Sequence, residues 1–257
     1  MKRAATVFLC GLLSFATTLA QNGGRKPAGA STDAKRAEQM PTAEQVLERY
    51  VRAIGGREAI EKVKTWVKKG SFELTDEMVA SVEFYEKAPN KFVHLVSFPG
   101  GGYFQEGFDG TVAWEKSAQD GLREITGPPM VWIRREADFH REIKLKQLYP
   151  IMSFKGKRKV RDIEAYVIEV SPADGKSEFW YFDSQTGLLL RRDDERTGGE
   201  DQVIFVTEFG DYREVGGLKV AHTIWRSSPS RWTIKFREIT PNAPVDDLKL
   251  SKPASDR

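Results

Sequence analysis

Apolar and polar residues alternate with a period of two over most of the chain from residue 65 onward. In 65–74, for example, Trp66 and Phe72 fall on one face of an extended chain, whereas Lys69 and Ser71 fall on the other. A half-buried antiparallel strand produces this pattern, because successive side chains point to opposite faces of the sheet. The pattern predicts strands over 65–74, 78–85, 91–98, 103–108, 111–117, 122–126, 153–160, 164–171, 177–183, 188–194, 202–213, 218–227 and 231–239.

Short glycine-containing breakers separate these ranges. Asp109-Gly110 suits a two-residue hairpin turn, and Gly198-Gly199 and Gly216-Gly217 take the same role between later strands. Because the loops are short, consecutive strands are expected to pair as a meander. We therefore predict an α+β fold built on a single curved antiparallel sheet of about eleven strands, with helices covering its concave face.

Three helical stretches accompany the predicted sheet. The first begins with a capping box over 42–45 and ends at Gly55-Gly56. A short second helix follows over 57–63, and a third is predicted from Pro128-Pro129 to about Arg141, continuing loosely to Leu148. An apolar sheet face needs a cover, so these helices are expected to form a lid.

The N-terminal segment has the pattern of a secretory signal peptide. A basic start at Lys2-Arg3 precedes an apolar run, and small residues lead up to Ala20. We predict cleavage near Ala20 and export to the periplasm, with 1–20 as signal peptide, 21–40 as a flexible linker and 41–257 as one domain. No integral membrane segment would remain in the mature chain. A membrane anchor is the alternative interpretation of the same apolar run.

Composition and spacing argue against several kinds of site. The formal net charge is +3, and loss of the two basic residues in the predicted signal peptide would bring it close to neutral, so nucleic acid is not an expected partner. Cys10 is the only cysteine and lies in that segment, which leaves the domain no thiolate for a disulfide or a metal site. His94, His140 and His222 are too far apart for a local metal signature, so neither a metal nor a cofactor is predicted.

The glycine triplet Gly100-Gly101-Gly102 does not fit a phosphate-binding loop. Such a loop leads into a helix whose N-terminus faces the anion, whereas the residues from Tyr103 to Glu106 form a strand pattern. The chain also lacks the G-x-S-x-G elbow of many hydrolases. We therefore predict no catalytic residue. A hydrolase is the least favoured alternative, kept because carboxylates distant in sequence can meet in a fold.

Aromatic and branched side chains occupy the strand positions expected to face the lid. A broad curved sheet with few helices leaves space over its concave face, and such space suits an apolar ligand. An ordinary packed core is the alternative. The predicted cavity wall consists of Trp66, Phe72, Val82, Phe84, Phe92, Ile168, Trp232, Ile234 and Phe236. Trp132 and Phe139 are predicted to belong to the lid.

Several short stretches carry turn signals in a recognisable order. They are VEFYEKAPNKF followed by GFDGTVAW, then WYFDSQTGLLLRR, and finally FGDYREVGGLKVAHTI. Together they resemble the periplasmic lipoprotein-carrier family, LolA and its outer-membrane lipoprotein-sorting-like relatives, over roughly 42–250. The resemblance implies an eleven-stranded half-barrel whose helices close a hydrophobic cavity. Many carriers have an arginine directly before the first proline, where this chain has Ala88, so its lid is expected to be gated differently or not at all.

The resemblance and the residues imply a periplasmic binding or carrier protein, not an enzyme. In the carriers the cavity shelters lipoprotein acyl chains, so the expected ligand is hydrophobic: a lipid, an acyl chain or a lipoprotein. The alternative is a module that binds another envelope protein or senses envelope stress, as relatives with this fold do. The two functions differ in whether the cavity is open or filled by side chains.

Overall fold

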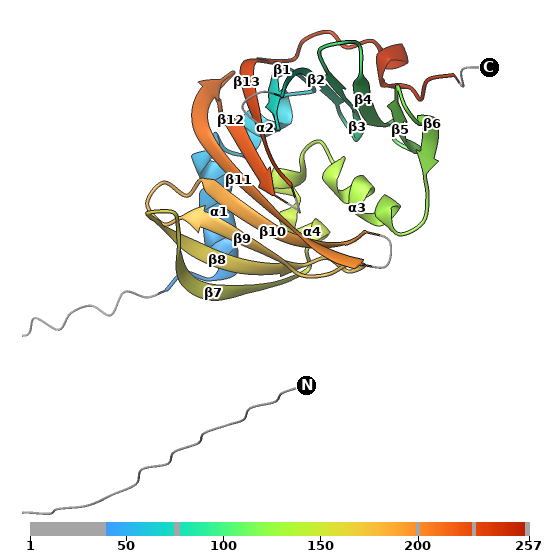
Figure 1. Ribbon diagram of the computed structural model, residues 1–257. Coiled ribbons are helices and arrows are strands. Elements are labelled where there is room, and N and C mark those ends of the chain that lie inside the picture. The colour runs from blue at the N-terminus through green and yellow to red at the C-terminus, as the bar shows by residue number, and fades with distance from the viewer. Residues whose placement is uncertain (1–39, 75–77, 199–200, 228–229, 255–257) are drawn as a thin grey trace, which may run out of the picture. The chain divides into compact units, whose positions relative to one another are not determined.

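An antiparallel sheet dominates the computed structural model, which describes residues 40–74, 78–198, 201–227 and 230–254 (Figure 1). The predicted signal peptide and the linker up to residue 39 lie outside these residues. Within the described part, thirteen strands form the sheet. They are β1 (Thr65–Glu73), β2 (Val79–Lys87), β3 (Lys91–Ser97), β4 (Tyr103–Phe108), β5 (Ala113–Ser117), β6 (Gly121–Ile125), β7 (Ile151–Val160), β8 (Ile163–Ser171), β9 (Glu178–Asp183), β10 (Leu189–Gly198), β11 (Asp201–Val215), β12 (Leu218–Ser227) and β13 (Arg231–Pro241).

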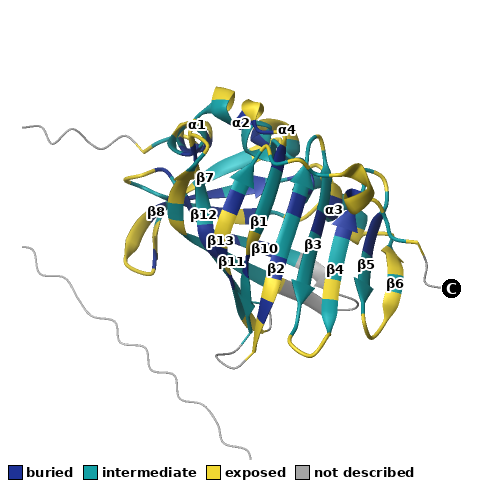
Figure 2. Ribbon diagram, turned by 90° about the horizontal axis from the view of Figure 1, so that it is seen from above, coloured by how far each residue is buried: buried dark blue, intermediate teal, exposed yellow. Residues whose placement is uncertain are grey.

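The predicted fold class is confirmed, and the predicted strand count is too low. Each sequence range with a period of two forms its own strand, because a short turn separates it from the next range. The predicted number of about eleven strands was therefore smaller than the thirteen strands observed. The helical elements are α1 (Ala43–Ala53), α2 (Arg57–Lys62), α3 (Pro129–Glu136), η1 (Arg141–Ile143), α4 (Leu145–Leu148) and η2 (Asp247–Leu250). Seen from above, α1, α2 and α4 lie toward one end of the strands (Figure 2).

The order of the strands in the sheet follows the chain with one exception. β1 to β6 pair in succession, as do β7 to β13, and β13 then pairs antiparallel with β1. This pairing joins two meanders into one sheet. β6 and β7 are left at opposite edges, so the sheet curves without closing (Figure 1).

The ladder between β1 and β13 contains a close backbone approach at Gly70. The register shifts between Lys69 and Gly70, where Gly70 faces Phe236. A Cβ atom added at Gly70 would lie 2.0 Å from the carbonyl oxygen of Lys235. Glycine is therefore the residue that this bulge can hold without displacing backbone.

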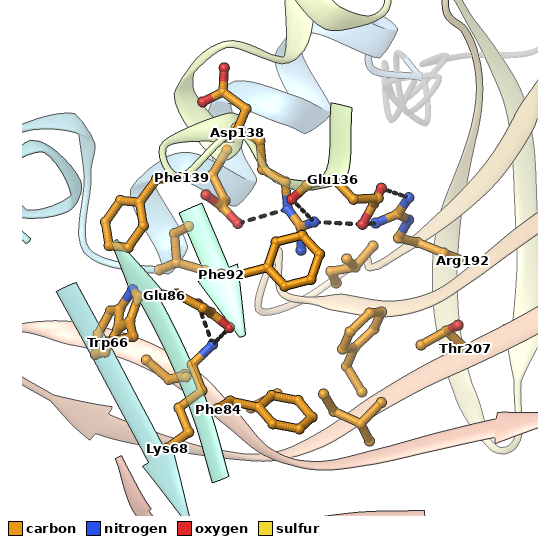
Figure 3. A pocket seen from close by; sticks show the side chains of 18 of the residues that line it. Trp66, Lys68, Phe84, Glu86, Phe92, Glu136, Asp138, Phe139, Arg192 and Thr207 are labelled. Atoms are coloured by element: carbon orange, nitrogen blue, oxygen red, sulfur yellow. Dashed lines mark hydrogen bonds and ion pairs between the residues drawn. The ribbon is translucent and has the colours of Figure 1, made fainter. Parts of the chain in front are cut away.

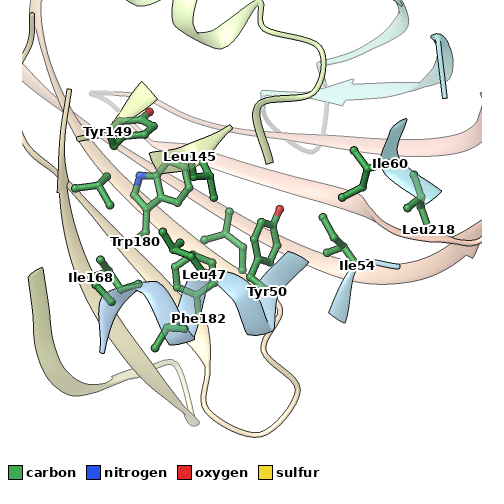
Figure 4. Close-up of a cluster of buried hydrophobic side chains, with 14 of the residues drawn as sticks. Leu47, Tyr50, Ile54, Ile60, Leu145, Tyr149, Ile168, Trp180, Phe182 and Leu218 are labelled. Carbon is green, nitrogen blue, oxygen red and sulfur yellow. The ribbon is translucent and has the colours of Figure 1, made fainter. Parts of the chain in front are cut away.

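Helix α1 covers the concave face of the β8 to β10 region. Its predicted capping box is confirmed, since the Gln45 backbone nitrogen donates to Thr42 Oγ1 at 3.2 Å and the Thr42 backbone nitrogen donates to Gln45 Oε1 at 2.9 Å. Figure 4 shows its buried stripe, in which the Tyr50 ring lies 5.2 Å from that of Phe182. Each fully buried apolar side chain contributes about 1.5–3 kcal/mol, so this interface fixes α1 on the sheet.

The segment 126–150 crosses the open side of the sheet, because it joins the two edge strands β6 and β7. The sequence predicted a helix there from Pro128-Pro129 to Arg141, and that length is wrong, because α3 ends at Glu136. The Asp138 carboxylate accepts hydrogen bonds from the His140 backbone nitrogen at 3.2 Å and from Lys144 Nζ at 2.9 Å. Such local hydrogen bonds compete with a continuing helix.

Buried ion pairs hold this segment on the sheet. The side chain of Glu178 in β9 is 3% exposed and accepts hydrogen bonds from four donors: Arg135 Nη2 (3.1 Å), Tyr149 Oη (3.1 Å), Trp180 Nε1 (2.9 Å) and Arg192 Nη2 (2.9 Å). Arg135 belongs to α3 and Tyr149 follows α4, whereas Arg192 belongs to β10. Glu178 therefore connects both ends of the crossing segment to two strands.

The C-terminal segment covers the opposite, convex face of the sheet. Leu250 in η2 is fully buried in a cluster with Tyr85 of β2, Val93 of β3 and Trp114 of β5. These residues alternate with side chains on the concave face, since successive strand residues point to opposite sides. The C-terminal segment thus covers the convex face of this half of the sheet, whereas the helices lie over its concave face.

We predict that Gly70→Ala lowers the free energy of unfolding by at least about 1–3 kcal/mol, because the new methyl group would displace the β13 backbone. Gly102→Ala is the matched control, since its Cβ atom would meet nothing closer than Phe98 Cβ at 3.7 Å. Urea unfolding followed by circular dichroism measures both variants. Equal midpoints for the two would contradict the close approach at Gly70.

We predict that Glu178→Gln lowers the free energy of unfolding by about 3–5 kcal/mol, because it leaves the Arg135 and Arg192 charges buried without their carboxylate. The control is Glu61→Gln, which removes an exposed pair with Arg57 at 3.5 Å and should cost no more than about 1 kcal/mol. The same unfolding experiment compares them. A Glu178→Gln protein as stable as the control would show that the ion pairs do not hold the segment.

Candidate functional site

A cavity of about 410 Å³ lies between the concave face of the sheet and the helices. Its wall contains residues of α1, α2, β1 to β4, β9 to β13, α3 and the turns that follow α3. Figure 3 shows Phe84 and Phe92 pointing into the space beneath Phe139. The volume falls within the range of small-molecule sites in proteins.

The cavity brings together eight of the eleven residues that the sequence assigned to wall and lid: Trp66, Phe84, Phe92, Trp132, Phe139, Trp232, Ile234 and Phe236. The other three lie beside it. Phe72 packs against Trp232 with ring centroids 5.5 Å apart, and Val82 is buried in the same cluster. Ile168 is fully buried in the core beneath α1. Phe72 and Val82 therefore pack beside the wall on the same face of the sheet, and none of the three lines the cavity.

A polar cluster lies within the aromatic wall. The strand register places Lys68 opposite Phe84, Phe84 opposite His94, and His94 opposite Glu106. His94 Nδ1 is 3.1 Å from Glu106 Oε1, and His94 Nε2 is 3.6 Å from Glu86 Oε1. Lys68 Nζ donates to both Glu86 oxygens at 2.9 Å. Four charged or titratable side chains from four adjacent strands thus meet on the cavity wall.

Aromatic rings enclose this cluster. The His94 imidazole is stacked against Phe84 at 3.9 Å and against Phe92 at 4.7 Å between ring centroids. Lys68 Nζ lies 5.8 Å from the ring centroid of Trp66. Ring faces attract cations, and they also limit the access of water. Lys68, Glu86 and His94 are therefore held largely away from bulk solvent, with 18–23% of their side chains exposed, whereas Glu106 is 45% exposed.

The surroundings shift the pKa values of two members of the cluster. Burial by itself would lower the pKa of His94, but the hydrogen bonds and charges of Glu106 and Glu86 outweigh burial and raise it above the ordinary value. Burial would raise the pKa of Glu86, yet Lys68 and His94 hold it well below its usual range. Both effects favour the ionised form of each group.

A second ionic cluster borders the cavity on the side of the lid. Glu136 of α3 accepts hydrogen bonds from Arg141 Nη1 at 2.5 Å and from Arg192 Nη2 at 2.7 Å. Arg141 Nε also lies 3.4 Å from Glu142 Oε1. The negative charge of Glu136, opposed by burial, raises the pKa of Arg141. Figure 3 shows the Glu136–Arg192 pair and the Lys68–Glu86 pair facing the same space.

The sequence patterns did not point to these charged residues, and no role was predicted for His94. A signal was present, because strand alternation places a residue on the same face as its second neighbour. The second position after a predicted wall residue is Lys68 after Trp66, Glu86 after Phe84 and His94 after Phe92. Which of them meet across strands depends on the register, which the alternation does not give.

The arrangement can exclude water from an apolar ligand and offer hydrogen bonds to a polar group beside it. In the part of the chain that the structure describes, no group of three or more His, Cys, Asp or Glu side chains is arranged to hold a metal ion. No helix among the described residues has the length and apolar character needed to cross a bilayer. The lining of the cavity is thus both apolar and ionic.

No protein-family model matches the chain, and no curated protein sequence matches it either. Several solved structures are similar to it, and three of them align with 81–83% of this chain. A DUF1329 family protein from Desulfovibrio piger is 15% identical, with 81% of this chain and 96% of that chain aligned at a TM-score of 0.55. A putative outer membrane lipoprotein-sorting protein domain from Vibrio parahaemolyticus is 13% identical, with 81% and 97% aligned at a TM-score of 0.53.

The third similar structure is a LolA superfamily protein from Nitrosomonas europaea. It is 10% identical, with 83% of this chain and 99% of that chain aligned at a TM-score of 0.52. At such identities the likeness concerns the fold and not the residues of the site. It agrees with the resemblance detected in the sequence, and the chain therefore has a LolA-like fold.

Proposed function

We propose that this protein binds a hydrophobic ligand, such as a lipid or an acyl chain, in the cavity and carries it without a covalent step. The observation that carries this proposal is the 410 Å³ cavity, lined by Trp66, Phe84, Phe92, Trp232 and Phe236. Each methylene group buried there is worth about 0.8 kcal/mol, so an acyl chain gains affinity with every carbon that enters.

The proposed place of action is the periplasm. The basic start, apolar run and small residues of 1–20 support export, and no later stretch of the sequence has that pattern. The LolA-like fold supports a carrier role, and the name of the Vibrio structure associates this fold with lipoprotein sorting. The ligand proposed here includes the acyl chains of a lipoprotein.

The crossing segment 126–150 is proposed to act as the lid. Trp132 and Phe139 of this segment line the cavity, and its ion pairs to β9 and β10 keep them over the sheet. A ligand enclosed in this way would be shielded from water on both sides. A protein-binding module without a ligand would not need such an enclosed apolar space.

We predict that Ile224→Trp lowers the affinity for the neutral probe N-phenyl-1-naphthylamine at least about tenfold, because the indole would occupy part of the cavity that Ile224 lines. Ile204→Trp is the matched control, since Ile204 is 64% exposed and does not line the cavity. Probe fluorescence measures both affinities. Equal affinities would place the probe outside the cavity.

Solvent extraction of protein purified from its own envelope, followed by mass spectrometry, would identify a natural ligand. We expect one lipid class to be enriched in the extract of the unaltered protein and reduced in that of the Ile224→Trp variant. A protein that is repeatedly empty and that binds no apolar probe would contradict the proposed function. Envelope proteins recovered with it would then favour the alternative, a protein-interaction module.

A further inference from the structure

We infer that the ligand of this cavity is an uncharged amphiphile, whose polar group forms hydrogen bonds but carries no net charge, because the ionic side chains of the cavity already compensate one another. The inference rests on the proposed function and narrows it to a chemical class. It is carried by the pairing and burial of two ionic clusters, one on β1 to β4 and one shared by the crossing segment with β9 and β10.

The first cluster contains two cations and two carboxylates. Lys68 and Glu86 form one pair, with 18% and 22% of their side chains exposed. His94 lies between Glu86 and Glu106 at 3.6 Å and 3.1 Å. The raised pKa of His94 favours its cationic form, and carboxylates are ionised near neutral pH. The cluster is then neutral as a whole.

The second cluster contains three arginines and three glutamates. The pairs are Arg192 with Glu136 at 2.7 Å, Arg135 with Glu178 at 3.1 Å and Arg141 with Glu142 at 3.4 Å. A guanidinium group does not lose its proton in a protein, so the arginines are permanent cations. This cluster is neutral too.

The remaining charges around the cavity also balance. Asp138 pairs with Lys144 at 2.9 Å, and Lys91 shares Asp247 with Lys87, each lysine at 3.2 Å. The two of these residues that line the cavity, Asp138 and Lys91, carry one charge of each sign. One further carboxylate and one further guanidinium, Asp194 and Arg226, belong to the lining, and so does Lys219, which is exposed to solvent. The enclosed part of the lining therefore offers no excess charge of either sign.

A charged head group would lose its hydration on entry without gaining an unpaired counter-charge to compensate. The carboxylates and cations of the two clusters that it would meet are already paired with one another. A hydroxyl, ester or amide group has a much smaller desolvation cost and can hydrogen-bond to the edges of the clusters. The cavity thus favours alcohols, acylglycerols and similar neutral lipids over fatty-acid anions, phosphate esters and quaternary ammonium lipids.

The test compares three amphiphiles of equal chain length: 1-decanol, decanoate and decyltrimethylammonium. Each competes with N-phenyl-1-naphthylamine for the full chain at pH 7 and below its micelle concentration. We expect decanol to bind at least about tenfold more tightly than either ion. Decanoate or decyltrimethylammonium binding as tightly as decanol would overturn the inference and leave the proposed function intact. Failure of all three, with no probe binding, would overturn the proposed function and the inference with it.

Two variants unbalance the cavity by one charge each. His94→Gln leaves Lys68 against two carboxylates, and Glu136→Gln leaves an excess guanidinium in the second cluster. We expect the affinity for decyltrimethylammonium to rise about tenfold in the first variant, and the affinity for decanoate to rise about tenfold in the second. Asp211→Asn is the control for Glu136→Gln, because it makes the same change of net charge at an exposed site outside the cavity and should alter neither affinity.

Thermal unfolding of each variant establishes that it is folded. If Glu136→Gln weakens the lid enough to unfold the protein, His94→Gln alone decides the outcome, since its side chain lies on the sheet and not in the crossing segment. A folded His94→Gln protein with unchanged preference between the two ions would overturn the inference. The opposite change in preference would overturn it as well.

Discussion

The antiparallel pairing of β13 with β1 is the interaction on which the rest of this structure depends. It places the last strand of the chain beside the first and so fuses two meanders into one sheet. The two strands that are consecutive at the middle of the chain, β6 and β7, are thereby forced to opposite edges. The segment that connects them therefore has to cross a face of the sheet, and it crosses the concave one. Gly70 allows the two backbones to approach closely enough for this pairing.

The ionic contacts of the crossing segment determine its position over the sheet more than they stabilise the fold. Desolvating a carboxylate and a guanidinium costs as much as their attraction returns, and apolar side chains of the same volume often pack at least as well. A guanidinium, however, binds a carboxylate only in a fixed planar geometry. Arg192, which meets Glu136 of α3 and Glu178 of β9, therefore sets how α3 lies over the strands. The apolar contacts of α3 with Phe108 and Ala113 would tolerate more sliding.

Local signals in the sequence were sufficient for the strands and for the start of α1, because alternation and capping involve residues only a few positions apart. The length of the third helix was wrong because Asp138 forms hydrogen bonds with its own neighbours, which periodicity does not reveal. Ile168 was assigned to the correct face but not to the cavity, since alternation says which side a residue faces and not which helix covers it. The cluster around His94 was missed because its partners come from separate strands and meet only in one register.

That register also explains how one wall can be both apolar and ionic. Across β1, β2 and β3, one row runs Trp66, Glu86, Phe92 and the next row runs Lys68, Phe84, His94. Each ionic side chain therefore has aromatic neighbours along its own strand and across to the next strand, and it reaches opposite charges on the diagonal, as Lys68 reaches Glu86. A register shift of one residue would turn all the side chains of a strand that now face the cavity to the convex face. A register shift of two residues would place Glu86 beside the wrong partners. The rings limit the access of water and the ion pairs neutralise the charges, so a wall that is both apolar and ionic depends on both.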